Sequence, residues 1–153
     1  MVMRTVFVRG SIAANTGHNH GAYPIFTLKA ESMPILKSSR DLVDEAMEEI
    51  RTYTVADVLP RLNDPQTQLV DIRDIRELAH GTVVGAFHAP RGMLEFWVDP
   101  ASPYYKPIFG DESKEYILFC GAGWRSALTA KALQDMGMTN VAHIDGGFTV
   151  FFN

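Results

Sequence analysis

Helical periodicity marks three segments of the chain. Apolar residues recur three or four positions apart over residues 38–51, which open with a Ser-x-x-Asp capping box at Ser38. A Thr-x-x-Asp box at Thr54 predicts a second, shorter helix. A third apolar stripe covers residues 126–136 and stops at Gly137, a residue type that commonly ends helices. Short helical pieces are also predicted at residues 75–79 and 91–98.

Four apolar runs alternate with these helices and have the length of buried strands. They cover residues 68–72, 83–89, 115–119 and 141–144. Strands that alternate with helices favour an α/β domain with a mainly parallel sheet and helices on both of its faces. Sites in such domains lie at the carboxyl ends of the strands, so the residues that follow each run are the candidates for chemistry.

Composition indicates one domain with a leader in front of it. The chain has 153 residues, 46% of them hydrophobic and 21% charged, which are the proportions of one globular domain. No Asp or Glu precedes Glu31, and the Gly-flanked stretch around His18 and His20 has no periodicity. We therefore expect a loosely ordered leader over residues 1–33, with solvated histidines, and a single domain over residues 34–153.

Charge and residue counts exclude several functions. The net charge of −4 and the lack of a basic run argue against nucleic acid as a partner. No apolar stretch reaches the roughly 18 to 20 residues that cross a bilayer, so we expect a cytoplasmic protein with no membrane partner. The single cysteine, Cys120, cannot form an internal disulfide, and too few ligands stand at suitable spacing for a metal site. No cofactor is expected.

Cys120 has the surroundings of a reactive thiol. It follows the predicted strand over residues 115–119, and a helix begins a few residues later, so the sulfur is expected over a helix N-terminus, where negative charge is stabilised. Gly121 and Gly123 allow backbone conformations that let successive N–H groups curl around an anion, and Arg125 adds a positive charge. A buried structural cysteine would need neither two glycines nor an arginine.

Four blocks, which together span about residues 50–151, resemble a known family. They are Leu69-Val70-Asp71-Ile72-Arg73 with Glu77, the run Gly81-x-x-x-Gly85-Ala86-x-His88, the loop from Cys120 to Ser126, and Asp145-Gly146-Gly147-Phe148. In order and spacing they resemble the rhodanese (thiosulfate sulfurtransferase) homology domain. The resemblance implies a five-stranded, mainly parallel sheet between helices and a persulfide carried on Cys120.

The resemblance also implies roles for the residues around the cysteine. The loop that would cradle the persulfide contains Gly121, Ala122, Gly123, Trp124 and Ser126. Arg125 matches the cation that assists anionic donors. Asp71, Arg73 and Glu77 match the family's buried polar cluster, for which we expect a structural role.

Three further residues are weighed from the sequence. Arg91 either binds a sulfonate at the same edge of the sheet or caps the helix that follows it. His88 and His143 are expected to pack or to lie at the surface rather than to act as general bases.

The expected reaction is transfer of sulfane sulfur. Cys120 would take sulfur from a small anionic donor such as thiosulfate and pass it to an external thiol, on a small molecule or a protein, or to cyanide. Two alternatives remain: a cysteine phosphatase or arsenate reductase of the same fold, and a non-enzymatic sulfur carrier or partner-binding module. The phosphatase loop has the form Cys-x5-Arg, whereas Ser126 stands here where that arginine would be.

The chain departs from the family pattern after the Gly-Gly-Phe block, where a final helix is expected to be missing. The helix over residues 38–51 would then cover the exposed sheet face, or Phe148, Phe151 and Phe152 would form a homodimer interface.

Overall fold

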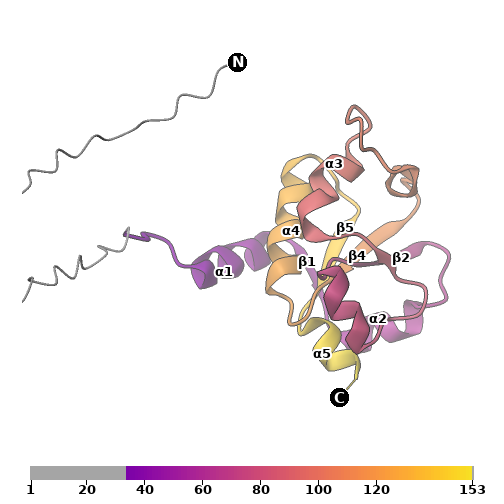
Figure 1. Ribbon diagram of the computed structural model, residues 1–153, viewed down its shortest axis with the longest axis horizontal. Coiled ribbons are helices and arrows are strands. Elements are labelled where there is room, and N and C mark those ends of the chain that lie inside the picture. Colours follow the sequence, from indigo (N-terminus) through magenta and orange to yellow (C-terminus); the bar gives the residue numbers. More distant parts are fainter. Residues whose placement is uncertain (1–33, 153) are drawn as a thin grey trace, which may run out of the picture. The chain divides into compact units, whose positions relative to one another are not determined.

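The computed structural model describes residues 34–152, which contain one five-stranded sheet (Figure 1). The strands are β1 (Arg51–Tyr53), β2 (Thr67–Asp71), β3 (Phe87–His88), β4 (Glu115–Phe119) and β5 (Val141–Ile144). They lie in the order β1-β5-β4-β2-β3, and every neighbouring pair is parallel. The predicted α/β class is confirmed, with β4 at the centre of the sheet. The leader over residues 1–33, with His18 and His20, lies outside the described residues.

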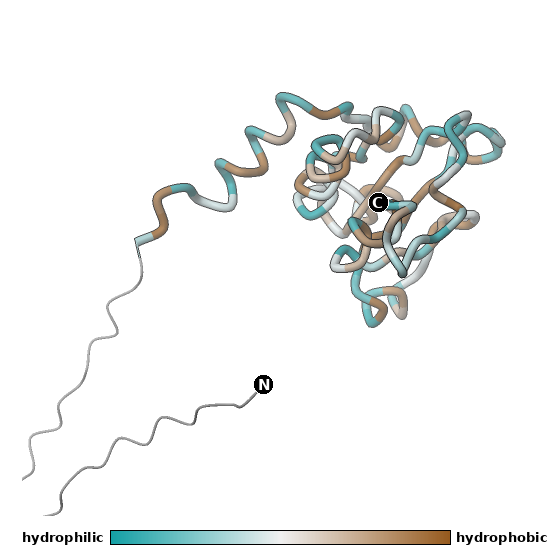
Figure 2. Tube along the Cα trace, turned by 90° about the horizontal axis from the view of Figure 1, so that it is seen from above, coloured by the Kyte–Doolittle hydropathy of each residue, from teal (hydrophilic) through white to brown (hydrophobic). Residues whose placement is uncertain are grey.

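Helices cover both faces of the sheet. α1 (Ser39–Glu49), α3 (Leu94–Val98) and α4 (Trp124–Asp135) pack on one face, and α2 (Val55–Val58) and α5 (Gly147–Phe151) pack on the other. The 3₁₀ helices are η1 (Leu59–Arg61), η2 (Ile75–His80), η3 (Arg91–Met93) and η4 (Pro107–Gly110). The predicted capping boxes at Ser38 and Thr54 start α1 and α2. Polar and apolar residues alternate along α1 (Figure 2), so one side of this helix packs against α4 while the other faces solvent.

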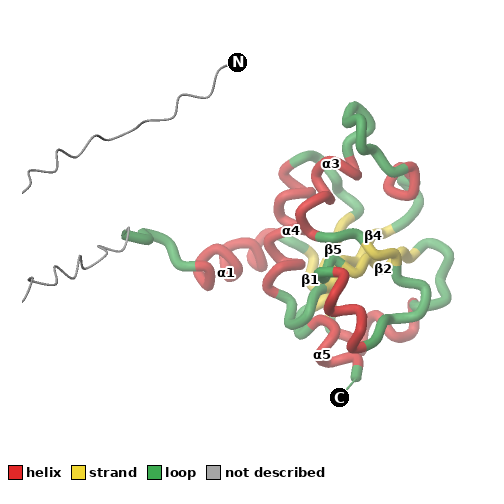
Figure 3. Tube along the Cα trace, in the orientation of Figure 1, coloured by secondary structure: helices red, strands yellow, loops and turns green. Residues whose placement is uncertain are grey.

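Two strands differ from the prediction. β1 (Figure 3) was missed, because it has three residues of which Arg51 and Thr52 are exposed, so that no apolar run marks it. β3 is shorter than the predicted run over residues 83–89. Gly85 has a φ of +82° and turns the chain there, which leaves Val84 92% exposed.

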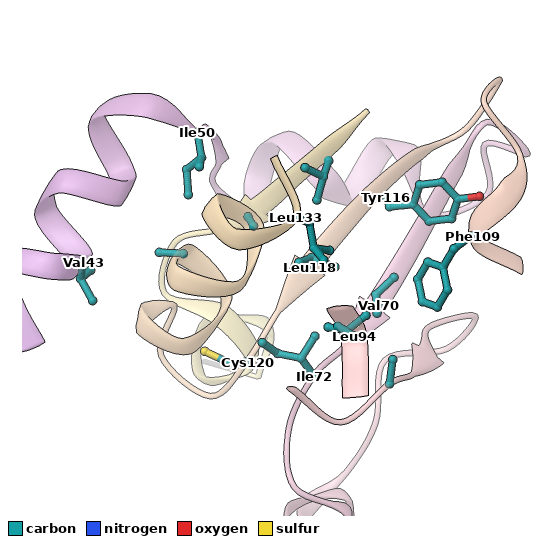
Figure 4. Packing of buried hydrophobic residues seen from close by; sticks show 14 residues of the cluster. Val43, Ile50, Val70, Ile72, Leu94, Phe109, Tyr116, Leu118, Cys120 and Leu133 are labelled. Atoms are coloured by element: carbon teal, nitrogen blue, oxygen red, sulfur yellow. The ribbon is translucent and has the colours of Figure 1, made fainter. Parts of the chain in front are cut away.

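The core has two clusters, one on each face of the sheet. Successive residues of β4 alternate between them: Tyr116 and Leu118 join the cluster under α1, α3 and α4, and Ile117 and Phe119 join the cluster under α2 and α5. Cys120 continues the first row and packs at its margin, as Figure 4 shows. The nucleophile candidate therefore follows directly on the central strand of the sheet, four of whose five residues are buried.

After β5 the chain forms a short helix, α5, over Gly147–Phe151, which ends where the final helix of the family pattern would begin. The Phe151 ring packs against Phe119 with centroids 5.7 Å apart, and Phe148 joins the same core cluster. Two of the three phenylalanines considered for a dimer interface thus pack within the chain, whereas Phe152 is 61% exposed.

Candidate active site

Cys120 follows β4 directly, at the carboxyl edge of the sheet. Its side chain is 1% exposed, and its sulfur accepts a hydrogen bond from the Gly123 N–H at 3.2 Å. The loop then runs into α4, whose first N–H groups lack the intrahelical acceptors available to later ones. Backbone donors at a helix N-terminus are the arrangement that stabilises an anionic sulfur or oxyanion.

Gly123 gives the loop its tight curvature. Its φ is +100°, and a Cβ at this position would lie 3.1 Å from the Gly146 nitrogen, so the predicted need for glycine is confirmed. The same prediction is wrong for Gly121, whose φ is not positive. A Cβ on Gly121 would lie 3.1 Å from Nη2 of Arg125, so a side chain there would require a small shift of the guanidinium.

The first residues of α5 brace the Cys120 loop, in the sense that they hold its backbone in place by hydrogen bonds. The Phe148 N–H donates to the Cys120 carbonyl at 2.7 Å, and the Thr149 N–H and hydroxyl donate to the Gly121 carbonyl at 3.0 and 2.8 Å. Gly147 permits this approach, since a Cβ there would lie 2.4 Å from the Cys120 carbonyl oxygen. Nothing in the neighbouring sequence indicates which backbone lies beside this glycine.

Arg125 is paired with Glu77 of η2. Two hydrogen bonds join the guanidinium to the carboxylate, at 2.6 and 2.8 Å. These bonds hold the pKa of Glu77 below its usual range and raise the pKa of Arg125 above its usual value. The Cys120 sulfur makes a smaller contribution to raising the pKa of Arg125. Glu77 also contacts the Asp71–Arg73 pair, because Arg73 Nη1 donates to its backbone carbonyl at 3.4 Å, but its carboxylate is bound by Arg125.

Asp71 and Arg73 form a buried pair behind the loop. Three hydrogen bonds of 2.6 to 3.1 Å join their side chains, and Arg73 Nη2 also donates to the Gly81 carbonyl at 2.9 Å. The guanidinium carbon lies 3.6 Å from the centroid of the Phe148 ring. The pair thus anchors the residue that braces Cys120, which fits a structural role.

Ser126 does not present its side chain to the loop, contrary to the expectation that it binds substrate. It is fully buried, and its hydroxyl donates to the Gly123 carbonyl at 3.0 Å and lies 3.2 Å from Nδ1 of His143. His143 lies beneath it, with Nε2 3.1 Å from the Thr52 hydroxyl, and burial lowers its pKa to about 4. Both side chains support α4 from inside the domain.

Three other candidates lie at the surface. Ala122 and Trp124 of the loop are exposed, and the Arg40 guanidinium of α1 lies 5.4 Å from the Trp124 ring centroid. Beside them is a cleft of about 450 Å³ between α1 and the loop. Arg91 is exposed and starts η3, and its N–H donates to the Ile72 carbonyl at 3.2 Å. Its side chain does not cap this helix and, within residues 34–152, makes no hydrogen bond or ion pair.

The described residues lack the features of a metal centre and of a membrane-spanning helix. Residues 34–152 contain no group of three His, Cys, Asp or Glu side chains placed to hold a metal ion. In this part of the chain no helix has the length and apolar character to cross a membrane.

The fold and the loop together define an α/β domain that holds one cysteine sulfur against the Gly123 N–H, at the carboxyl edge of a parallel sheet. The model of the rhodanese-like domain matches residues 54–153, and the chain belongs to this family. Two of its relatives are named as sulfurtransferases. Helix α1 lies outside the matched residues.

Three relatives illustrate the similarity. A protein of unknown function from Rhodopseudomonas palustris, described as a possible tyrosine phosphatase, is 46% identical, with a TM-score of 0.74 over 78% of this chain and 92% of that one. The putative sulfurtransferase YtwF of Bacillus subtilis is 27% identical over 65% of this chain and 87% of its own length. The tRNA sulfurtransferase of Shewanella frigidimarina is 28% identical over 69% of this chain, which spans only 23% of that protein.

Proposed function

We propose that the protein transfers sulfane sulfur through a persulfide on Cys120. The observation that carries the proposal is the Cys120 sulfur hydrogen-bonded by the Gly123 N–H inside a loop that α5 braces. Two relatives named as sulfurtransferases support the same chemistry.

The reaction is a double displacement. The Cys120 thiolate attacks the outer sulfur of a donor, the donor's sulfur–sulfur or sulfur–sulfonyl bond breaks, and the donor leaves with the electron pair of that bond. With thiosulfate, the products are the Cys120 persulfide and sulfite. Backbone N–H groups at the start of α4 stabilise the negative charge on the persulfide. The chain has one cysteine, so the acceptor, a thiol or cyanide, comes from outside it.

A mass measurement of the intact protein tests the covalent step. Incubation with excess sulfane-sulfur donor should add about 32 Da, and cyanide or a thiol should remove it. Cys120→Ser should show neither the added mass nor turnover while keeping the fold, because an alcohol cannot carry the persulfide. Turnover in this variant, or sulfur retained after cyanide, would refute the mechanism.

Phosphate-ester hydrolysis is the second candidate, because the relative from Rhodopseudomonas palustris is described as a possible tyrosine phosphatase. The position that would hold the phosphatase arginine is Ser126, which is buried and hydrogen-bonded beneath the loop. We therefore expect no appreciable hydrolysis of aryl phosphates. Hydrolysis faster than sulfur transfer, with both activities lost in Cys120→Ser, would make the phosphatase the correct assignment.

A further inference from the structure

The charges around the Cys120 loop balance one another. The Arg125–Glu77 pair lies over Gly121, because a Cβ on that glycine would lie 3.1 Å from Arg125 Nη2 and 3.7 Å from Glu77 Oε1. The two side chains are 37% and 36% exposed, so the pair stands at the mouth of the loop and not in the core. A donor that reaches the sulfur meets the guanidinium with its charge already cancelled.

Neighbouring groups do not restore a positive charge. Arg73 is paired with Asp71 and Arg76 with Asp74, at 2.6 and 2.7 Å. On the other side of the loop, the Asp145 carboxylate would lie 3.3 Å from a Cβ on Gly123, and it makes no ion pair within residues 34–152. Arg40, whose guanidinium lies over the Trp124 ring, is paired with Asp44 at 3.0 Å. Among these described groups, Asp145 and the exposed Arg91 are left without an ion pair and have opposite charges, so the surroundings of Cys120 supply no net positive charge.

We propose that Glu77 is a specificity-determining residue, which cancels the charge of Arg125 so that Cys120 takes sulfur from donors with at most one negative charge in preference to dianions. This inference rests on the proposed sulfur transfer and narrows its donor class. Thiosulfate, with two charges, becomes a poor donor. Thiosulfonates with one charge, and persulfides of uncharged or zwitterionic thiols, become the better ones.

Two donors with matched chemistry separate charge from reactivity. Thiosulfate gives the Cys120 persulfide and sulfite. Methanethiosulfonate, CH3–SO2–S⁻, gives the same persulfide and methanesulfinate, because its sulfur–sulfur bond breaks in the same way. The Coulomb energy between site and donor is proportional to the donor's charge. A change of one elementary charge in the site therefore changes the energy of the dianion by twice as much as that of the monoanion. The fold-change in rate for the dianion is then the square of the fold-change for the monoanion.

The experiment compares kcat/KM for both donors in the wild type, in Glu77→Gln and in a control, Glu112→Gln. Glutamine keeps an oxygen that can accept the Asp74 N–H now bound by Glu77, so η2 is expected to persist. Glu112 is exposed and precedes β4, at the edge of the sheet opposite Cys120, so its variant changes net charge by the same amount without touching the loop. In Glu77→Gln we expect kcat/KM to rise about tenfold for thiosulfate and about threefold for methanethiosulfonate. Glu112→Gln should leave the ratio of the two unchanged.

The wild type supplies a test that does not depend on the variant folding. Its preference for methanethiosulfonate over thiosulfate should exceed the preference of a free small thiol by about tenfold or more. The inference is overturned if the wild type and the free thiol have equal preferences, or if the ratio of kcat/KM for the two donors is unchanged in folded Glu77→Gln. In either case, sulfur mass added to Cys120 would still support the proposed function. Failure of both donors to add sulfur to Cys120 overturns the proposed function and the inference with it.

Discussion

Gly147 is the most demanding position in the brace beneath Cys120. Its φ is +54°, and a Cβ there would lie 2.4 Å from the Cys120 carbonyl oxygen and 2.9 Å from that of Gly121. In Gly147→Ala the left-handed conformation alone costs about 1 to 2 kcal/mol. The clash is with backbone and cannot be relieved by a side-chain rotation, so α5 must move and the Phe148 and Thr149 N–H bonds to the loop must lengthen. Weakening these two hydrogen bonds costs about 1 kcal/mol each, so the free energy of unfolding is expected to fall by about 3 to 4 kcal/mol in all.

Gly85→Ala is the matched control for this prediction. Gly85 also has a positive φ, +82°, but nothing lies within 4 Å of a Cβ placed there, so only the conformational cost of about 1 to 2 kcal/mol applies. Urea denaturation gives the free energy of unfolding, and the rate of persulfide formation on Cys120 reports on the loop. Gly147→Ala should lose more stability than the control and should slow persulfide formation, whereas Gly85→Ala should keep the wild-type rate. Equal stability and equal rates in the two variants would show that α5 does not brace the loop.

Two further variants test the charges in and beneath the site. Arg125→Ala should lower kcat/KM for thiosulfate about tenfold, because it leaves Glu77 unneutralised, yet cost at most about 1 kcal/mol of stability, since the pair is one-third exposed; unchanged kinetics with a lowered melting temperature would make Arg125 structural. His143 has its pKa lowered to about 4 by burial, so the unfolded chain takes up this proton first as the pH falls below about 6.5, and the fold loses stability between there and pH 4. Urea denaturation at pH 7 and at pH 4.5 gives the free energy of unfolding that each protein loses between the two pH values. This loss should be smaller in His143→Gln than in the wild type by about 2 to 3 kcal/mol. Equal losses would mean that His143 is protonated in the folded protein.

Local signals in the sequence predicted most of the fold. The capping boxes at Ser38 and Thr54 each need only four consecutive residues, and both start helices where expected. The apolar runs of β2, β4 and β5 are buried on both faces, which is why they read as continuous. β1 could not be found this way, because its backbone pairs with β5 while Arg51 and Thr52 remain exposed.

The site was predictable only where its geometry is local. The place of Cys120 between a strand and a helix, and the need for glycine at position 123, follow from neighbouring residues. The pairing of Arg125 with Glu77 joins residues 48 positions apart, and the contact of Gly147 with the Cys120 carbonyl depends on how β5 returns beside β4. Such contacts are set by the packing of the sheet and have no signature in the chain itself.

The two shortest strands form the edges of the sheet, and this limits how copies of the chain can associate. β1 has three residues and β3 has two, so neither edge offers the row of free N–H and C=O groups that another strand needs for pairing. Arg51 adds a charge to the β1 edge and is itself engaged by Glu115. Within residues 34–152, the strand lengths therefore disfavour edge-to-edge aggregation and the pairing of two copies through a continuous sheet.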